Sequence, residues 1–175
     1  MKIPPIAIPL FLTAVLLAQA TKPAFTGRWE VDKSRSTART VFVKHPELSG
    51  PPAPVPPAGH AFDTMRPQTI TLRGSSLVIV DEPAGNLPER SFKLTTNNQP
   101  NITSLPGGGV NRSSTRWDGK QLVTTWVLEQ GGMPIMRGTD RRSLSDDGAT
   151  LIQERTVITP LHESQLHIVW IRRRR

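Results

Sequence analysis

Apolar and polar residues alternate with a period close to two through most of the chain after residue 67. This alternation is typical of β-strands that bury one face. Beyond the first twenty residues, no segment shows a convincing helical pattern. We expect strands at 25–31, 69–73, 77–80, 91–96, 112–117, 121–129, 134–145, 150–159 and 165–173, and a short strand or turn at 40–44.

The turn residues between these segments predict their pairing. Asp-Gly at 118–119 and 147–148 is a strong signal for a tight hairpin, and Gly-Ser at 74–75 and Gly-Gly at 131–132 act similarly. Sequential hairpins produce a meander, which must split into a sandwich or close on itself. Closure removes exposed edges, so we expect an all-β protein: an antiparallel up-and-down meander closed into a barrel of about 8–10 strands.

The first twenty residues resemble a secretory signal peptide. Lys2 precedes an apolar run at 3–17, and Ala18 and Ala20 are small enough for a cleavage site. The run is short and contains prolines, which disfavours the alternative of an uncleaved membrane anchor. We therefore predict a signal peptide at 1–20, one domain at 21–175, and export to the periplasm or the medium.

A long irregular stretch interrupts the strand pattern at 32–66. Prolines crowd residues 49–59, and a central strand cannot contain so many residues without an N–H group. We expect a proline-rich loop at about 45–66. A loop of this length in a small domain is usually a lid, a binding loop or disordered.

Three motifs suggest a family. Residues 25–29, Phe-Thr-Gly-Arg-Trp, resemble the Gly-x-Trp signature of lipocalins and their calycin relatives. Trp-Asp-Gly-Lys-Gln-Leu at 117–122 and Leu-Ser-Asp-Asp-Gly-Ala-Thr-Leu at 144–151 resemble hairpins of exported, uncharacterised lipocalin-like proteins from acidobacterial genomes. The Asp-Lys-Ser turn at 32–34 lacks one spacer of that group's Asp-x-x-Lys-Ser pattern.

The resemblance implies roles for three residues near the ends of the barrel. Gly27 would let the first strand bend, and Trp29 would close one end of the barrel. In lipocalins an arginine of the last strand packs on this tryptophan, and Arg172 is the matching candidate. The alternative is that 172–175 form a solvated basic tail.

The sequence contains no cysteine, which excludes thiol nucleophiles and cysteine-based metal centres. The four histidines lack the spacing of a metal site. Neither a Gly-x-Ser-x-Gly elbow nor a phosphate-binding loop occurs. We therefore expect no metal, no cofactor and no nucleic acid partner, and nothing in the chain indicates catalysis.

One segment departs from regular alternation. A face of 134–145 has apolar ends but carries Gly138, Asp140 and Arg142 in its middle. If this face points inward, the two charges would pair or contact a polar ligand head. The alternative, which we favour, is a solvated outer face or an edge strand. Trp126 is a candidate wall of the lumen, or an ordinary core residue.

These patterns predict an exported lipocalin-like protein that binds a small, largely apolar molecule or lipid in its lumen, with the proline-rich loop covering the mouth. Such a barrel can instead be filled by its own side chains. The formal charge of +8 supports a second hypothesis, an envelope protein that binds anionic lipid or polysaccharide through its basic surface. A third is a small hydrolase or isomerase built in the lumen.

Overall fold

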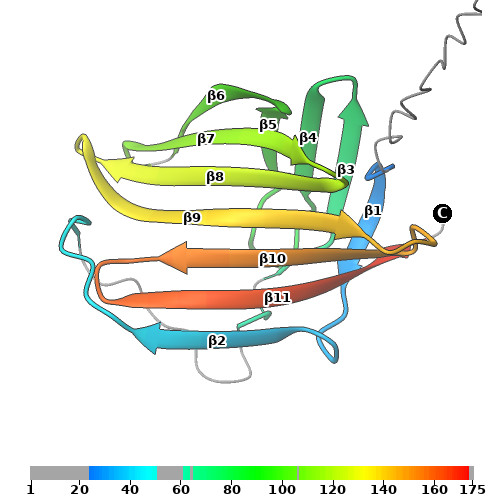
Figure 1. The fold of residues 1–175 in the computed structure, drawn as a ribbon, viewed down its shortest axis with the longest axis horizontal. Coiled ribbons are helices and arrows are strands. Elements are labelled where there is room, and N and C mark those ends of the chain that lie inside the picture. Colours follow the sequence, from blue (N-terminus) through cyan, green and yellow to red (C-terminus); the bar gives the residue numbers. More distant parts are fainter. Residues whose placement is uncertain (1–23, 51–60, 64, 106, 174–175) are drawn as a thin grey trace, which may run out of the picture.

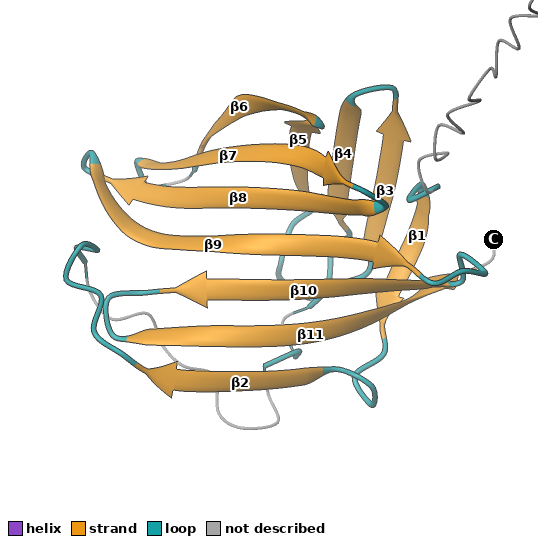
Figure 2. Cartoon of the chain, viewed as in Figure 1, coloured by secondary structure: helices purple, strands orange, loops and turns teal. Residues whose placement is uncertain are grey.

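The computed structural model describes residues 24–50, 61–63, 65–105 and 107–173. This part of the chain is entirely β-strand and loop (Figure 2). It contains no helix long and apolar enough to cross a membrane. The strands are β1 (Gly27–Val31), β2 (Thr37–Phe42), β3 (Gln68–Arg73), β4 (Ser76–Asp81), β5 (Arg90–Thr95), β6 (Asn97–Ser104), β7 (Gly109–Asp118), β8 (Gln121–Gln130), β9 (Met133–Leu144), β10 (Thr150–Ile158) and β11 (His162–Arg173).

All strands belong to one antiparallel sheet in the order β5-β4-β3-β1-β11-β10-β9-β8-β7-β6, with β2 beside β11 (Figure 1). The sheet curls until β5 approaches β6. There the amide and hydroxyl of Thr95 donate hydrogen bonds to Asn101 Oδ1 over 3.0 and 3.3 Å. The predicted all-β, antiparallel, nearly closed barrel is confirmed, and the hairpins at 118–119, 131–132 and 147–148 lie where the sequence predicts them.

Two strands differ from the prediction. β6 occupies residues that we expected to be loop, because its sequence, NNQPNITS, has almost no apolar face. It lies at one end of the strand order and contains Pro100 next to a shift in register, as edge strands permit. β2 is longer than the short strand expected within the irregular stretch, and it begins earlier.

β1 and β2 share one edge of β11. β1 pairs with its second half, from Trp170 to Arg173, and β2 pairs with its first half, from His162 to His167. Asp32 sits at the break, where its carboxylate accepts hydrogen bonds from Ser34 and Arg35. Figure 1 shows β2 running along β11 at the lower edge of the sheet. Much of the predicted proline-rich loop lies outside the described residues.

The end of the barrel near the start of β1 is filled. The inward side chains there form one apolar cluster around Trp29, which is fully buried and donates its indole N–H to the Phe25 carbonyl at 3.0 Å. The other members that are at most 1% exposed are Phe25, Ile70, Leu77, Leu122, Leu151, Ile168 and Trp170. Burying side chains of this size contributes about 1.5–3 kcal/mol each, so this end provides most of the hydrophobic stabilisation.

Arg172 closes this end by stacking on Trp29. Its guanidinium carbon lies 4.6 Å from the centre of the indole ring, and it donates to the carbonyls of Ala24 and Thr26 at 2.8 and 3.1 Å. Gly27 lies beneath, where a Cβ would be 3.5 Å from Arg172 Nη1, an ordinary contact. The arrangement ties the last strand to the residues that precede the first.

Replacing Arg172 by Leu should lower the free energy of unfolding by roughly 2–4 kcal/mol, because the stack and two charged hydrogen bonds are lost. Urea unfolding followed by tryptophan fluorescence measures this. The matched control is Arg173→Leu, which removes only an exposed ion pair with Glu30 and should cost about 1 kcal/mol or less. Equal losses in the two variants would contradict a specific role for the stack.

Candidate ligand cavity

The middle of the barrel is polar, unlike the filled end. Asp140 and Arg142 on β9 are each only 5% exposed. Their strand neighbours across the sheet are Arg155 and Gln153 on β10. The solvated outer face that we favoured for Asp140 and Arg142 is therefore wrong. The face of β9 that carries Asp140 and Arg142 points inward, because Leu144 on the same face packs against the apolar cluster.

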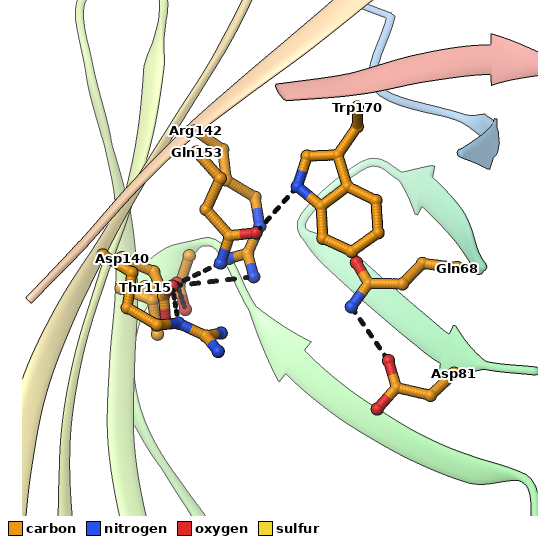
Figure 3. A network of polar contacts seen from close by, with 9 residues as sticks. Gln68, Asp81, Thr115, Asp140, Arg142, Gln153 and Trp170 are labelled. Carbon is orange, nitrogen blue, oxygen red and sulfur yellow. Dashed lines mark hydrogen bonds and ion pairs between the residues drawn. The ribbon is translucent and has the colours of Figure 1, made fainter. Parts of the chain in front are cut away.

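Asp140 is the centre of a hydrogen-bonded network (Figure 3). Its Oδ1 accepts from Gln153 Nε2 at 2.5 Å and from Arg155 Nε at 2.7 Å, and lies 4.0 Å from Arg142 Nη2. Gln153 in turn accepts the indole N–H of Trp170 at 3.0 Å. The network thus connects the apolar end of the barrel to the polar middle.

The charges of this network are unevenly balanced. Burial by itself would raise the pKa of Asp140, but Arg155, Arg142 and the hydrogen bonds lower it to about 2, so the carboxylate is ionised at neutral pH. Burial lowers the pKa of Arg142, only partly offset by Asp140. One buried carboxylate therefore serves two arginines, of which Arg155 is 32% exposed.

A second polar cluster lies on the opposite wall, around Asp81 of β4. Gln68 Nε2 on β3 donates to Asp81 Oδ1 at 2.9 Å. Arg66 and Arg90 approach the other carboxylate oxygen at 3.5 and 3.8 Å. Arg66 also donates to the Pro88 carbonyl at 2.5 Å and so joins this wall to the loop before β5.

Two adjoining cavities occupy the space between these clusters. The inner one has a volume of about 260 Å³ and is lined by Gln68, Ile79, Asp81, Arg90, Phe92, Leu94, Leu105, Asn111, Ser113, Thr124, Trp126, Leu128, Asp140, Arg142 and Arg155. The second, called the outer cavity here because the segments before β3 and β5 line part of it, has a volume of about 370 Å³ and is lined by Met65, Arg66, Gln68, Asp81, Leu87, Arg90, Gln153, Arg155 and Trp170. They share Gln68, Asp81, Arg90 and Arg155, and together reach the size of small-molecule sites.

Three buried polar atoms on the inner cavity's wall have no hydrogen-bond partner among the described residues. They are Gln68 Oε1, Asn111 Oδ1 and Arg142 Nε. Buried polar groups are nearly always paired, because an unpaired one costs about 1–3 kcal/mol. Two residues of the cavity wall therefore carry an unpaired donor, on Arg142, and an unpaired acceptor, on Gln68, among the described residues.

The sequence-predicted residues Trp126, Asp140 and Arg142 all line the inner cavity. Gly138 explains the position of Trp126. A Cβ at 138 would lie 2.4 Å from Trp126 Cζ2 and 2.3 Å from the Thr156 carbonyl oxygen. Only glycine leaves room for this indole against β9, so Gly138 allows Trp126 to take its place in the wall of the inner cavity.

Other wall residues were missed, although part of the signal was present. Gln153 and Arg155 follow Leu151 at every second position of β10, so they lie on the same inward face as this buried leucine. Gln68, Asp81 and Asn111 lie on strands whose polar residues resemble ordinary outer positions. Only the closure of the barrel brings them to one cavity.

The histidines do not converge within the described part of the chain. His162 is buried and its Nδ1 lies 3.0 Å from Thr159 Oγ1, whereas His167 is partly exposed and pairs with Glu154. No three histidine, aspartate or glutamate side chains among the described residues are placed to hold a metal ion. His60 lies outside the described residues.

No family model matches the sequence, and no curated protein matches it. Solved structures with a similar fold include the zebrafish ileal bile acid-binding protein complexed with cholic acid, with a TM-score of 0.53 and 15% identity over 85% of this chain and 98% of that one. Another is the REP1-NXSQ fatty acid transporter, with a TM-score of 0.51 and 11% identity over 86% and 96%. Human cRBP IV has a TM-score of 0.50 and 13% identity over 86% and 98%. The chain therefore has a lipocalin-like, calycin-type fold.

Replacing Asp140 by Asn should lower the free energy of unfolding at pH 7 by about 3–5 kcal/mol, because Arg142 and Arg155 lose their shared carboxylate. The pKa of Asp140 is lower in the folded chain than in the unfolded one. Its stabilisation is therefore complete above about pH 5 and is lost as the pH falls toward 2, by about 2 kcal/mol. Urea unfolding at pH 7, 5 and 3 measures both effects.

The control is Asp118→Asn, which alters an exposed carboxylate 3.7 Å from Arg141 and should change stability by about 1 kcal/mol or less. Asp140→Asn should flatten part of the acid-induced loss, whereas Asp118→Asn should leave it intact. An unchanged pH profile in Asp140→Asn would show that the network does not hold Asp140 ionised.

Proposed function

We propose that this protein binds a small, largely apolar molecule with an anionic head group in the barrel lumen. The observation that carries the proposal is the sharing of one buried carboxylate, Asp140, by Arg142 and Arg155 at the wall of a cavity. A buried excess of positive charge is costly unless an anion compensates it. A ligand carboxylate beside Arg142 would supply that charge.

The rest of the inner cavity suits an apolar body. Its wall combines the polar groups with apolar and aromatic side chains from β4, β5, β8 and the loop after β6: Ile79, Phe92, Leu94, Leu105, Trp126 and Leu128. Enclosing an apolar chain there would contribute about 25 cal/mol per Å² of surface removed from water. The apolar wall would supply affinity, and the arginine would fix the orientation of the ligand.

Two of the structural neighbours support this ligand class by their own descriptions. One holds cholic acid and another is a fatty acid transporter. Both ligands combine an apolar body with a carboxylate. The identities of 15% and 11% relate the folds alone, so the proposal rests on the residues of this cavity.

We propose further that the ligand enters through the outer cavity. Met65 and Arg66, which precede β3, and Leu87, before β5, form its wall, and Leu87 is 49% exposed. Arg66 links the two segments through the Pro88 carbonyl. These loops would then cover the mouth, as the sequence predicts for the region before β3.

We also propose that the protein is exported, as the signal-like residues 1–20 and the resemblance to exported acidobacterial proteins indicate. Expression of the full chain in a bacterial host should give a mature protein that begins at Thr21 in the periplasm or the medium. N-terminal sequencing of the fractionated protein measures this. A chain that keeps Met1 in the cytoplasm would contradict export.

The ligand class can be tested with dodecanoic acid and dodecan-1-ol, which differ only in the head group. The wild-type protein should bind the acid at least tenfold more tightly than the alcohol, as measured by isothermal titration calorimetry. Arg142→Met should reduce this preference about tenfold, since Asp140 keeps Arg155 and Gln153 but the ligand loses its cation.

The neighbouring Arg141→Met is the matched control, because Arg141 lies on the outer face and is half-exposed. It should bind the acid as wild type does. Urea unfolding of each variant confirms that the compared proteins are folded. Failure of folded wild type to bind either compound, or equal binding of both, would refute the proposal.

A further inference from the structure

The orientation of the Gln68 amide is fixed by its neighbour. Gln68 Nε2 donates to the carboxylate of Asp81 at 2.9 Å, an interaction that the amide oxygen could not make. Reversing the amide would place two acceptors against each other. Oε1 is therefore the atom left over, and it is buried without a partner among the described residues.

Gln68, which carries this acceptor, lines both cavities. Figure 3 shows the Gln68 amide and Arg142 approaching from different walls of the barrel. One wall therefore provides an unused donor on a cation, and the other provides an unused acceptor. A ligand that contacts both needs an anionic group and, separately, a hydrogen-bond donor.

We infer that the ligand is a hydroxylated acid: an apolar body with a carboxylate for Arg142 and a hydroxyl that donates to Gln68 Oε1. This inference rests on the proposed function and narrows it. A plain alkyl acid would satisfy the arginine but leave the Gln68 oxygen unpaired inside an occupied site. An acid with a hydroxyl at the matching position pairs both groups.

Asn111 Oδ1 on β7 is a second unpaired acceptor in the inner cavity. Among the described residues its amide has no partner that fixes its orientation, so it can meet either a donor or an acceptor. Gln68 therefore carries the inference, and Asn111 would accommodate a second polar group on the same ligand. The combination favours hydroxylated molecules over plain fatty acids.

The test compares dodecanoic acid with a series of its monohydroxy isomers, by isothermal titration against wild type. At least one isomer should bind about tenfold more tightly than the unsubstituted acid, the effect of one net hydrogen bond in a buried site. Gln68→Met should make the affinities for that isomer and for dodecanoic acid equal, because methionine has similar length and no acceptor of comparable strength.

Gln165→Met is the control, since Gln165 is exposed on β11 and should leave the gain unchanged. The comparison of isomers on wild type decides the question even if Gln68→Met does not fold. Should dodecanoic acid bind while no isomer gains, or should Gln68→Met keep the gain, the hydroxyl inference is overturned and the proposed function stands. Failure of every probe to bind would overturn both.

Discussion

The placement of one carboxylate inside the barrel constrains most of what surrounds it. Asp140 compensates Arg142 and Arg155, and through Gln153 it is connected to Trp170 of the apolar end. A slip of β9 by one residue would bring Arg141 inward and expose Asp140, leaving several buried cations unpaired. The network therefore selects the register of β9 against β10 as firmly as the apolar residues do.

The barrel divides its interior between two tasks. The end that contains Trp29 is filled with large side chains and closed by Arg172, so it supplies stability without leaving room for a ligand. The middle keeps a cavity, whose wall includes arginines and aspartates. Small barrels can fill their lumen with side chains or leave space for one small molecule, and this chain fills one part and keeps cavities in another.

The sequence predicts the hairpins well because each carries its own local signal, such as the Asp-Gly turns between β7 and β8 and between β9 and β10. It does not predict β6, whose polar residues form a strand only because β7 pairs with it. Nor does it decide the direction of Asp140 and Arg142, since the polar residues on both faces of β9 permit either choice. The partners that settle it, Gln153 and Arg155, come from another strand and matter only once the register is fixed.

The polar middle is difficult to explain by stability alone. Replacing a buried ion pair with well-packed apolar residues often leaves a protein equally or more stable, so charges inside a barrel are weak evidence for a purely structural role. Here Gln68 Oε1 and Arg142 Nε also have no partner among the described residues, which adds cost without structural return. The apolar packing around Trp29 stabilises the fold enough to offset that cost. A lumen that keeps such groups beside a cavity is better explained by recognition of a polar, charged part of a ligand than by folding.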